Sequence, residues 1–448
     1  MNRYLQGTFA PVHEERTAFD LEVTGTVPEH LDGRYLRIGP NPATDPGESY
    51  HWFLGEGMVH GVRLEGGRAR WYRNRYVRAQ GDDFAPNTNV FEHAGRTLAV
   101  VEAGATPYEL TDELETVGPC HLGTVTGGYT AHPHEDPATG ELHAVSYSWT
   151  RGNLVDYSVV GTDGRVRHQV EIEVTGSPMI HDCALTEHYL VVYDLPVTFD
   201  LGMVAGEAPR PLQGPLHATD RLIDQTLRTG APSRLPYSWD ADYPARIGLL
   251  PRDGTGADVR WFDIDPCYVF HTLNAYEDGT DVVIDVVRHD RMFATDFTGP
   301  NEGAAYLTRF TVDTVAGKVR EHRFDEHSQE FPRHDERLTG RRHRYGYAAG
   351  VVAAGVRTGD SVLKHDLVAG TTTERRLGAG REVSEFCFVP SAPDSAEDDG
   401  VLMGYVFDAA AGTSDLVLLD AATLEDVAAI HLPGRVPAGF HGNWAPTV

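Results

Sequence analysis

The 448-residue sequence predicts an all-β protein whose short strands form a β-propeller. Two features support this prediction. Strand-like segments recur along the chain in pairs joined by tight turns, and apolar β-branched segments lie between these pairs. No stretch shows the extended 3.6-residue periodicity of a long helix. A double β-sandwich is the alternative that the pattern alone leaves open.

The hairpins are the clearest local elements. Residues 58–64 have the pattern of a strand, Glu65-Gly66-Gly67 that of its turn, and residues 68–73 that of the returning strand. Gly and Asp supply the backbone conformations that such reversals need. Further hairpins of this kind are expected at residues 154–174, 306–322, 362–370 and 416–430.

The apolar segments between the hairpins are rich in Val, Ile and Leu, and are typical of strands buried on both faces. They occupy residues 98–101, 190–193, 282–287 and 401–406. In a propeller each blade is a four-stranded meander, and the inner strands of all blades approach one axis.

One stretch departs from the strand pattern. Residues 202–238 are rich in Pro and Gly, and within them residues 218–228 have a short helical pattern with Leu222, Ile223 and Leu227 on one face. The stretch is either a surface excursion that packs its apolar side on the body or a lid at the entrance for an apolar ligand. We expect it to shape the mouth of a tunnel.

Composition excludes several classes of function. The net charge of −28 repels nucleic-acid phosphates, so we expect no nucleic-acid partner. The four cysteines are far apart and contain no C-x-x-C pair, which predicts buried free thiols. No segment approaches the roughly 20 apolar residues of a membrane span, and the first residues lack the apolar core of a signal peptide. We therefore expect a cytoplasmic protein.

Four histidines stand in similar short phrases that are spread over the chain. The phrases are Ala131-His132-Pro133, Ile180-His181-Asp182, Phe270-His271-Thr272 and Phe440-His441-Gly442. Neutral imidazole is the commonest metal ligand. A chain with 22 histidines places some of them in turns by chance, so the argument for a metal rests on the four together. Dispersed ligands converge only if the fold brings distant strand ends to one point, which also favours the propeller.

An ordered set of phrases resembles the carotenoid cleavage oxygenase family. The resemblance runs from about residue 17 to the end, in the family's order. It is carried by residues 33–42 (GRYLRIGPNP), 51–60, 130–137, 179–187, 270–275, 330–333, 384–386 and 439–442.

The resemblance implies a seven-bladed β-propeller, a single domain over residues 1–448, with loops and short helices capping one axial Fe(II). It assigns four histidine ligands: His132, His181, His271 and His441. It also assigns three glutamates that hold them: Glu102 on His181, Glu330 on His271 and Glu385 on His441. A carboxylate bonded to the outer nitrogen of a ligand imidazole fixes its tautomer and raises its basicity. His132 would have no such partner.

Three further residues are expected near the iron. Thr88 matches a family position that crowds one open coordination site, while Phe53 and Phe270 are expected nearest the alkene. Six further histidines are expected outside the site as surface or structural residues: His134, His188, His289, His334, His343 and His431.

The family chemistry joins O2 to an electron-rich double bond and splits it into two carbonyls. Relatives that act on phenolic alkenes carry a lysine directly before the first glutamate, where this chain has Val101. An aliphatic side chain cannot anchor a phenolate, which favours a carotenoid or apocarotenoid. Such polyenes reside in membranes, so transient contact with a membrane surface is expected.

Three alternatives stay open at this point. They are the same chemistry on a stilbene or phenylpropanoid alkene, isomerase-type chemistry, and a propeller that only binds a partner without turnover. The complete set of ligand phrases argues against the last of these.

Overall fold

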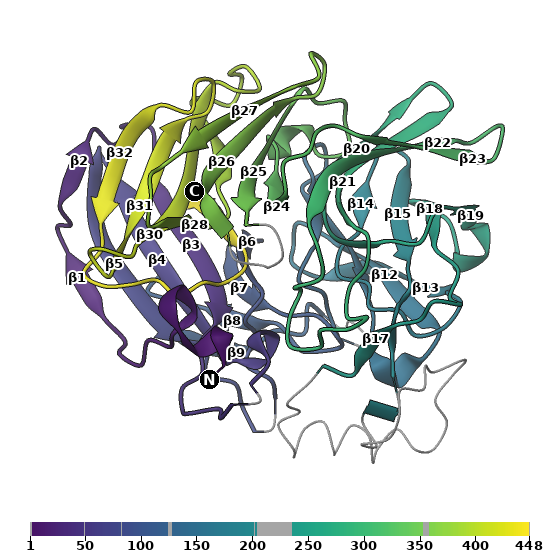
Figure 1. Ribbon diagram of the computed structural model, residues 1–448, viewed down its shortest axis with the longest axis horizontal. Helices are drawn as coiled ribbons and strands as arrows, with labels where there is room; N and C mark the ends of the chain where they lie inside the picture. Colours follow the sequence, from purple (N-terminus) through teal and green to yellow (C-terminus); the bar gives the residue numbers. More distant parts are fainter. Residues whose placement is uncertain are drawn as a thin grey trace.

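The structure is a computed structural model that describes residues 2–48, 50–81, 83–123, 128–200, 202–203, 235–352 and 358–447. Seven β-sheets of four or more strands are arranged around a central axis (Figure 1), which confirms the predicted seven-bladed propeller. The expected helix at residues 218–228, and most of the stretch at residues 202–238, lie outside the described residues.

Blades one to four follow one another along the chain. Blade one contains β1 (Thr17–Phe19), β5 (Arg68–Tyr76), β4 (Gly57–Glu65), β3 (Gly33–Pro40) and β33 (Gly442–Pro446). Blade two contains β6 (Asn89–His93), β7 (Arg96–Val100), β8 (Tyr108–Leu110) and β9 (Thr116–Pro119). Blade three contains β10 (His134–Asp136), β11 (Glu141–Ser146), β12 (Leu154–Val160) and β13 (Val166–Glu173). Blade four contains β14 (Ala184–Leu185), β15 (Tyr189–Asp194), β18 (Arg246–Pro251) and β19 (Arg260–Asp263).

Blades five to seven complete the ring. Blade five contains β20 (Tyr268–Asp278), β21 (Asp281–His289), β22 (Ala305–Asp313) and β23 (Lys318–Arg323). Blade six contains β24 (Gln329–Arg333), β25 (Tyr345–Val351), β26 (Thr358–Asp366) and β27 (Thr371–Arg376). Blade seven contains β28 (Arg381–Val383), β29 (Cys387–Pro390), β30 (Gly400–Asp408), β31 (Thr413–Asp420), β32 (Asp426–His431) and β2 (Val23–Gly25).

The predicted hairpins and apolar strands are present. Residues 58–64 and 68–73 fall in β4 and β5, which pair antiparallel, and the other four predicted hairpins form in the same way. The four apolar segments fall in β7, β15, β21 and β30. All four cysteines are buried and free, as predicted.

Short helical turns and an extra ribbon lie outside the blades. The ribbon pairs β16 (Val197–Phe199) with β17 (Tyr237–Trp239). The one-turn helices with defined bounds in the described chain are η1 (Arg3–Leu5), η2 (Gly7–Phe9), η3 (Trp52–Leu54), η4 (Trp149–Arg151), η5 (Gly256–Asp258) and η6 (Glu336–Leu338). In Figure 1, the N-terminus and β17 lie along the lower edge, where loops gather. None of the described helices has the length and hydropathy needed to span a bilayer.

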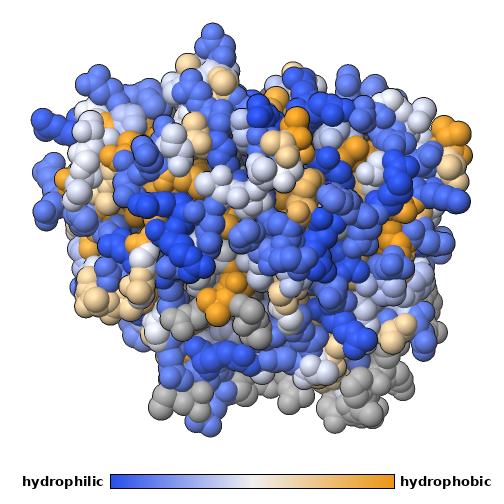
Figure 2. Space-filling view, turned by 45° about the horizontal axis from the view of Figure 1, so that its top comes forward, coloured by the Kyte–Doolittle hydropathy of each residue, from blue (hydrophilic) through white to orange (hydrophobic). Residues whose placement is uncertain are grey.

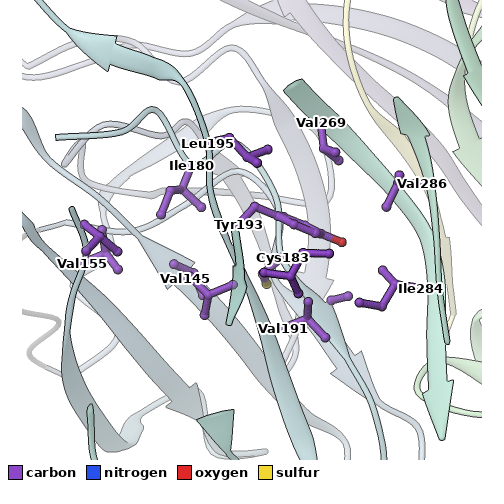
Figure 3. Packing of buried hydrophobic residues seen from close by; sticks show 14 of the residues in the cluster. Val145, Val155, Ile180, Cys183, Val191, Tyr193, Leu195, Val269, Ile284 and Val286 are labelled. Carbon is purple, nitrogen blue, oxygen red and sulfur yellow. The ribbon is translucent and has the colours of Figure 1, made fainter. Parts of the chain in front are cut away.

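The core lies between neighbouring blades. Figure 3 shows one such region, where Val145 and Val155 of blade three, Val191 of blade four and Ile284 of blade five belong to one buried cluster. Burying such side chains stabilises the fold by about 1.5–3 kcal/mol each. The face in Figure 2 is mainly hydrophilic with small separate hydrophobic patches, in keeping with the high net charge.

The ring is closed twice by strands from opposite ends of the chain. The late strand β33 pairs with β3 in blade one, and the early strand β2 pairs with β32 in blade seven. Gly33 lies at the crowded β3–β33 contact, where an added Cβ would collide with the Ala445 carbonyl oxygen and lie 2.8 Å from the Pro446 Cα. The closing strand therefore depends on a residue without a side chain at this position.

We expect Gly33→Ala to lower the free energy of unfolding by about 1–3 kcal/mol, because the backbone of β33 cannot relax away without losing the pairing. The matched control is Gly359→Ala, a strand glycine whose added Cβ would meet its nearest atom at 3.5 Å. That change should stay within about 0.5 kcal/mol. Urea unfolding measures both, and equal stability of the two variants would contradict the role given to this closure.

Candidate metal centre

The four predicted ligand histidines converge on the propeller axis from four blades. His132 precedes β10, His181 precedes β14, His271 lies within β20 and His441 precedes β33. Their ligand nitrogens all lie within 4.8 Å of one another. Blade-end positions that are far apart in the sequence thus meet at one point, as the phrases predicted.

The nitrogens that face one another are the Nε2 atoms. His132 and His181 are separated by 3.0 Å between these atoms, His181 and His271 by 3.3 Å, and His271 and His441 by 3.2 Å. Adjacent ligands of one ion with metal–nitrogen bonds of about 2.1 Å lie about 3.0 Å apart when the bonds are perpendicular. The spacing therefore matches a single shared ion.

Three carboxylates fix the orientation of three of these rings. His181 Nδ1 lies 2.9 and 3.0 Å from the two oxygens of Glu102. His271 Nδ1 lies 2.5 Å from Glu330 Oε2, and His441 Nδ1 lies 3.0 Å from Glu385 Oε1. An ionised carboxylate only accepts hydrogen bonds, so each Nδ1 donates its proton outward and each Nε2 presents a lone pair inward.

His132 differs from the other three histidines. No carboxylate contacts it among the described residues, which agrees with the arrangement that the family resemblance implies. Burial and the neighbouring histidines hold the pKa of His132 well below its usual range, so its ring is neutral and available as a ligand.

The carboxyl groups of Glu330 and Glu385 stay ionised although both are buried. Burial alone would raise the pKa of Glu330, but His271 and His289 outweigh it and the pKa lies well below its usual range. Burial is likewise outweighed at Glu385 by Arg333 and His441, which lower its pKa to about 2. Arg333 Nη1 lies 3.2 Å from Glu385 Oε2.

The charges in direct contact leave a negative excess. The three carboxylates carry three negative charges, and Arg333 is the one arginine or lysine in ion-pair contact with them among the described residues. Buried charge without a partner is costly. The donor set and the excess of two negative charges both fit a divalent cation.

Irregular backbone in the inner strands places these side chains. The β20–β21 register shifts between Val269 and Thr272, around Phe270 and His271. The β24–β25 register shifts directly after Glu330, where Phe331 has a φ of 57°. Glu385 lies in the break between β28 and β29. Such bulges re-aim side chains that a regular ladder would point elsewhere.

A cavity of about 940 Å³ is lined by three of the four histidines, His181, His271 and His441. Its walls include Phe53, Phe270 and Phe440. The centroid of the Phe53 ring lies 6.4 Å from that of Phe270 and 5.4 Å from that of Phe440. Thr88 also lines the cavity, and its carbonyl oxygen accepts from the His441 amide at 3.1 Å. The three residues expected near the alkene and the iron, Phe53, Phe270 and Thr88, thus line the same cavity.

The structure adds residues that the sequence did not single out. His289, expected outside the site, is instead buried, lines the cavity and lies 2.6 Å from Glu330 Oε1. Its phrase matches no motif, so the sequence held no signal for it. His134 contacts Asp182. The other four histidines bond residues other than the four ligands: His188 bonds Glu277, His334 bonds Thr339, His343 bonds Asn274 and His431 bonds Asp415.

Asp182 joins three of the ligand-bearing segments. It follows His181, accepts from the Thr272 amide beside His271 at 2.7 Å, and lies 2.8 Å from His134 Nε2. Burial would raise the pKa of Asp182, but His134 and the Thr272 amide lower it. This carboxylate therefore fixes the relative positions of three ligand segments behind the centre.

Comparison with known proteins finds similar sequences and similar solved structures. The family model described as retinal pigment epithelial membrane protein matches residues 9–446. A carotenoid cleavage oxygenase of Mycobacterium tuberculosis is 51% identical to this chain, and the match covers 100% of this chain and 98% of the relative's length. The lignostilbene dioxygenase of Pseudomonas brassicacearum has a TM-score of 0.84 at 26% identity, covering 99% of this chain and 98% of its own. Cobalt-substituted apocarotenoid oxygenase of Synechocystis has a TM-score of 0.83 at 26% identity, covering 98% and 97%.

We expect Glu102→Gln to weaken divalent metal binding about tenfold, because the amide no longer fixes the His181 tautomer as a carboxylate does. The matched control is Glu277→Gln, which alters a His–Glu pair on the surface, where His188 Nδ1 lies 3.0 Å from Glu277. Titration of the metal-free proteins with Co²⁺ measures both affinities. Equal weakening in the two variants would show that the loss is not specific to the centre.

Proposed function

The chain belongs to the family of the retinal pigment epithelial membrane protein and the carotenoid cleavage oxygenases, and we propose that it is a ferrous dioxygenase that cleaves a double bond of a carotenoid or apocarotenoid. The observation that carries this proposal is the set of four convergent Nε2 atoms, which belong to histidines of which three line a large cavity. We assign His132, His181, His271 and His441 as the ligands of Fe(II).

A ferrous ion bound there would supply the activation of O2 beside the double bond, so that each new carbonyl receives one oxygen atom. The four imidazoles add no charge and leave coordination positions free. We assign Thr88 to the wall that narrows one of these positions. The protein's own part is to hold the alkene in place and to exclude water.

Two aromatic side chains of the cavity, Phe270 and Phe53, would hold the alkene. Phe270 is buried and adjoins the ligand His271, and its ring lies 5.2 Å from that of His181, edge to face. Phe53 is edge to face with Phe270 at the same end of the cavity. Apolar rings around the ion stabilise a conjugated chain by area burial and fix which bond lies against the metal.

Cavity composition supports a polyene as the substrate. Val101, directly before Glu102, lines the cavity, and Arg78 is the one arginine or lysine among its described lining residues. Arg78 pairs with Glu15 at 2.8 Å and is largely exposed, so it does not provide a buried anchor for a phenolate. The 51% identical relative is itself named a carotenoid cleavage oxygenase.

A second candidate is cleavage of a stilbene or another aryl alkene. The likeness to lignostilbene dioxygenase favours it, at a TM-score as high as that to the apocarotenoid enzyme. Cleavage of either substrate requires the same metal centre, and the two differ only in the cavity that each substrate needs.

Contact with a membrane surface is a further part of the proposal. Phe84 lines the cavity and is 38% exposed, which places an apolar side chain at its solvent side. A polyene dissolved in a bilayer would enter the cavity with least exposure to water if this side faced the lipid.

The proposed activity is tested with purified protein loaded with Fe²⁺ and incubated with panels of apocarotenoids and hydroxystilbenes under ¹⁸O2. We expect cleavage of apocarotenoids, with label in both carbonyl products by mass spectrometry. Label in one product alone would contradict dioxygenase chemistry, and geometric isomers without cleavage would indicate isomerase chemistry. Absence of any turnover by the loaded protein would overturn the proposal.

Val101→Lys tests the substrate assignment separately. A cation beside Glu102 should shift the ratio of kcat/KM values toward hydroxystilbenes by about tenfold, since one charged hydrogen bond to a phenolate contributes roughly 1.5–3 kcal/mol. Val101→Met is the matched control, because it extends the side chain without adding charge. An equal shift in both variants would assign the effect to cavity volume instead.

A further inference from the structure

His289 stands out because it connects the wall of the cavity to the metal centre. It is the last residue of β21, its side chain is 7% exposed, and no motif marks it in the sequence. Its Nε2 lies 2.6 Å from Glu330 Oε1, and its ring meets that of Phe270 edge to face at 5.3 Å. One residue thus contacts both the carboxylate behind His271 and the aromatic ring in front of it.

The hydrogen bonds of Glu330 show why this contact matters. Its Oε2 accepts from His271 Nδ1 at 2.5 Å and from the Phe331 amide at 2.8 Å. Its Oε1 accepts a hydrogen bond from His289 alone among the described residues. Without His289, one oxygen of a buried carboxylate would have no donor and the group could rotate about its remaining bonds.

The other two carboxylates are anchored differently. Both oxygens of Glu102 face His181 Nδ1, and the Tyr147 hydroxyl adds a further hydrogen bond. Glu385 Oε2 accepts from the Gly442 amide at 2.8 Å and lies beside Arg333. Each glutamate has its own anchor, and for Glu330 that anchor is His289.

The tautomer of His289 follows from the same contacts. An ionised Glu330 can only accept, so His289 carries its proton on Nε2. Its Nδ1 is buried and has no hydrogen-bond partner in the described residues. The side chain therefore makes one polar contact, and that contact is with Glu330.

We propose that His289 is a positioning residue for the metal centre: through Nε2 it holds Glu330, and Glu330 holds the His271 ring with Nε2 toward the ion. This inference rests on the proposed metal site. It adds a fourth outer residue to the three glutamates, and it predicts that a change in the cavity wall alters metal affinity.

The test compares His289→Phe, which retains ring packing against Phe270 but cannot donate, with His289→Gln, whose amide can reach Glu330. Metal-free proteins are titrated with Co²⁺, and the visible absorption of the bound ion is recorded. We expect about tenfold weaker binding and an altered spectrum for His289→Phe, with His289→Gln within threefold of the unchanged protein. His60→Phe is the control, since His60 is a buried histidine that bonds Tyr72 at 2.9 Å in blade one.

Each result has a defined meaning. If His289→Phe binds Co²⁺ as the unchanged protein does and only its thermal midpoint falls, the residue is merely structural and the inference is wrong. Equal losses in the Phe and Gln variants would also overturn it, because donation to Glu330 would not be the cause. Should His289→Phe fail to fold, His289→Asn, whose shorter amide cannot reach Glu330, replaces it in the comparison with Gln. Failure of the unchanged protein to bind Co²⁺ would instead contradict the proposed function.

Discussion

The arrangement depends on one unfavourable interaction, the approach of the Nε2 lone pairs of His181, His271 and His441 to within 3.2–3.3 Å of each other on the propeller axis. Left alone, two such rings would reorient so that one donates to the other. The glutamates prevent this for three rings because each one binds the outer N–H and fixes the tautomer. A cation at this point would relieve the repulsion, so the outer carboxylates leave the centre suited to a metal ion.

The propeller supplies the centre by giving each blade one contribution. Blades one, three, four and five provide His441, His132, His181 and His271, while blades two, six and seven provide Glu102, Glu330 and Glu385. Packing between blades sets the backbone positions, and the bulges and breaks in the inner strands set the side-chain directions. Gly404 shows how closely this is fitted, since an added Cβ would lie 2.6 Å from the Glu385 carbonyl oxygen.

Much of this architecture is visible in the sequence because it is local. The turn at Glu65-Gly66-Gly67 and the apolar segment at residues 282–287 obey the rules of hairpins and buried strands, and the structure has both. The histidine phrases were recognisable because strand ends leave short, distinctive patterns. His289 was not, since its role comes from a partner 41 residues away in the next blade, at a distance that no local pattern encodes. The connections made by Asp182 are non-local in the same way.

The double closure of the ring has a consequence for biosynthesis. His441 directly precedes β33, which reaches blade one only after the six other blades have been made. Before β33 is made, the growing chain has three of the four histidines but lacks His441, and the ring of blades is still open. The pairing of β33 with β3 therefore closes the propeller and completes the four-histidine cluster in a single step.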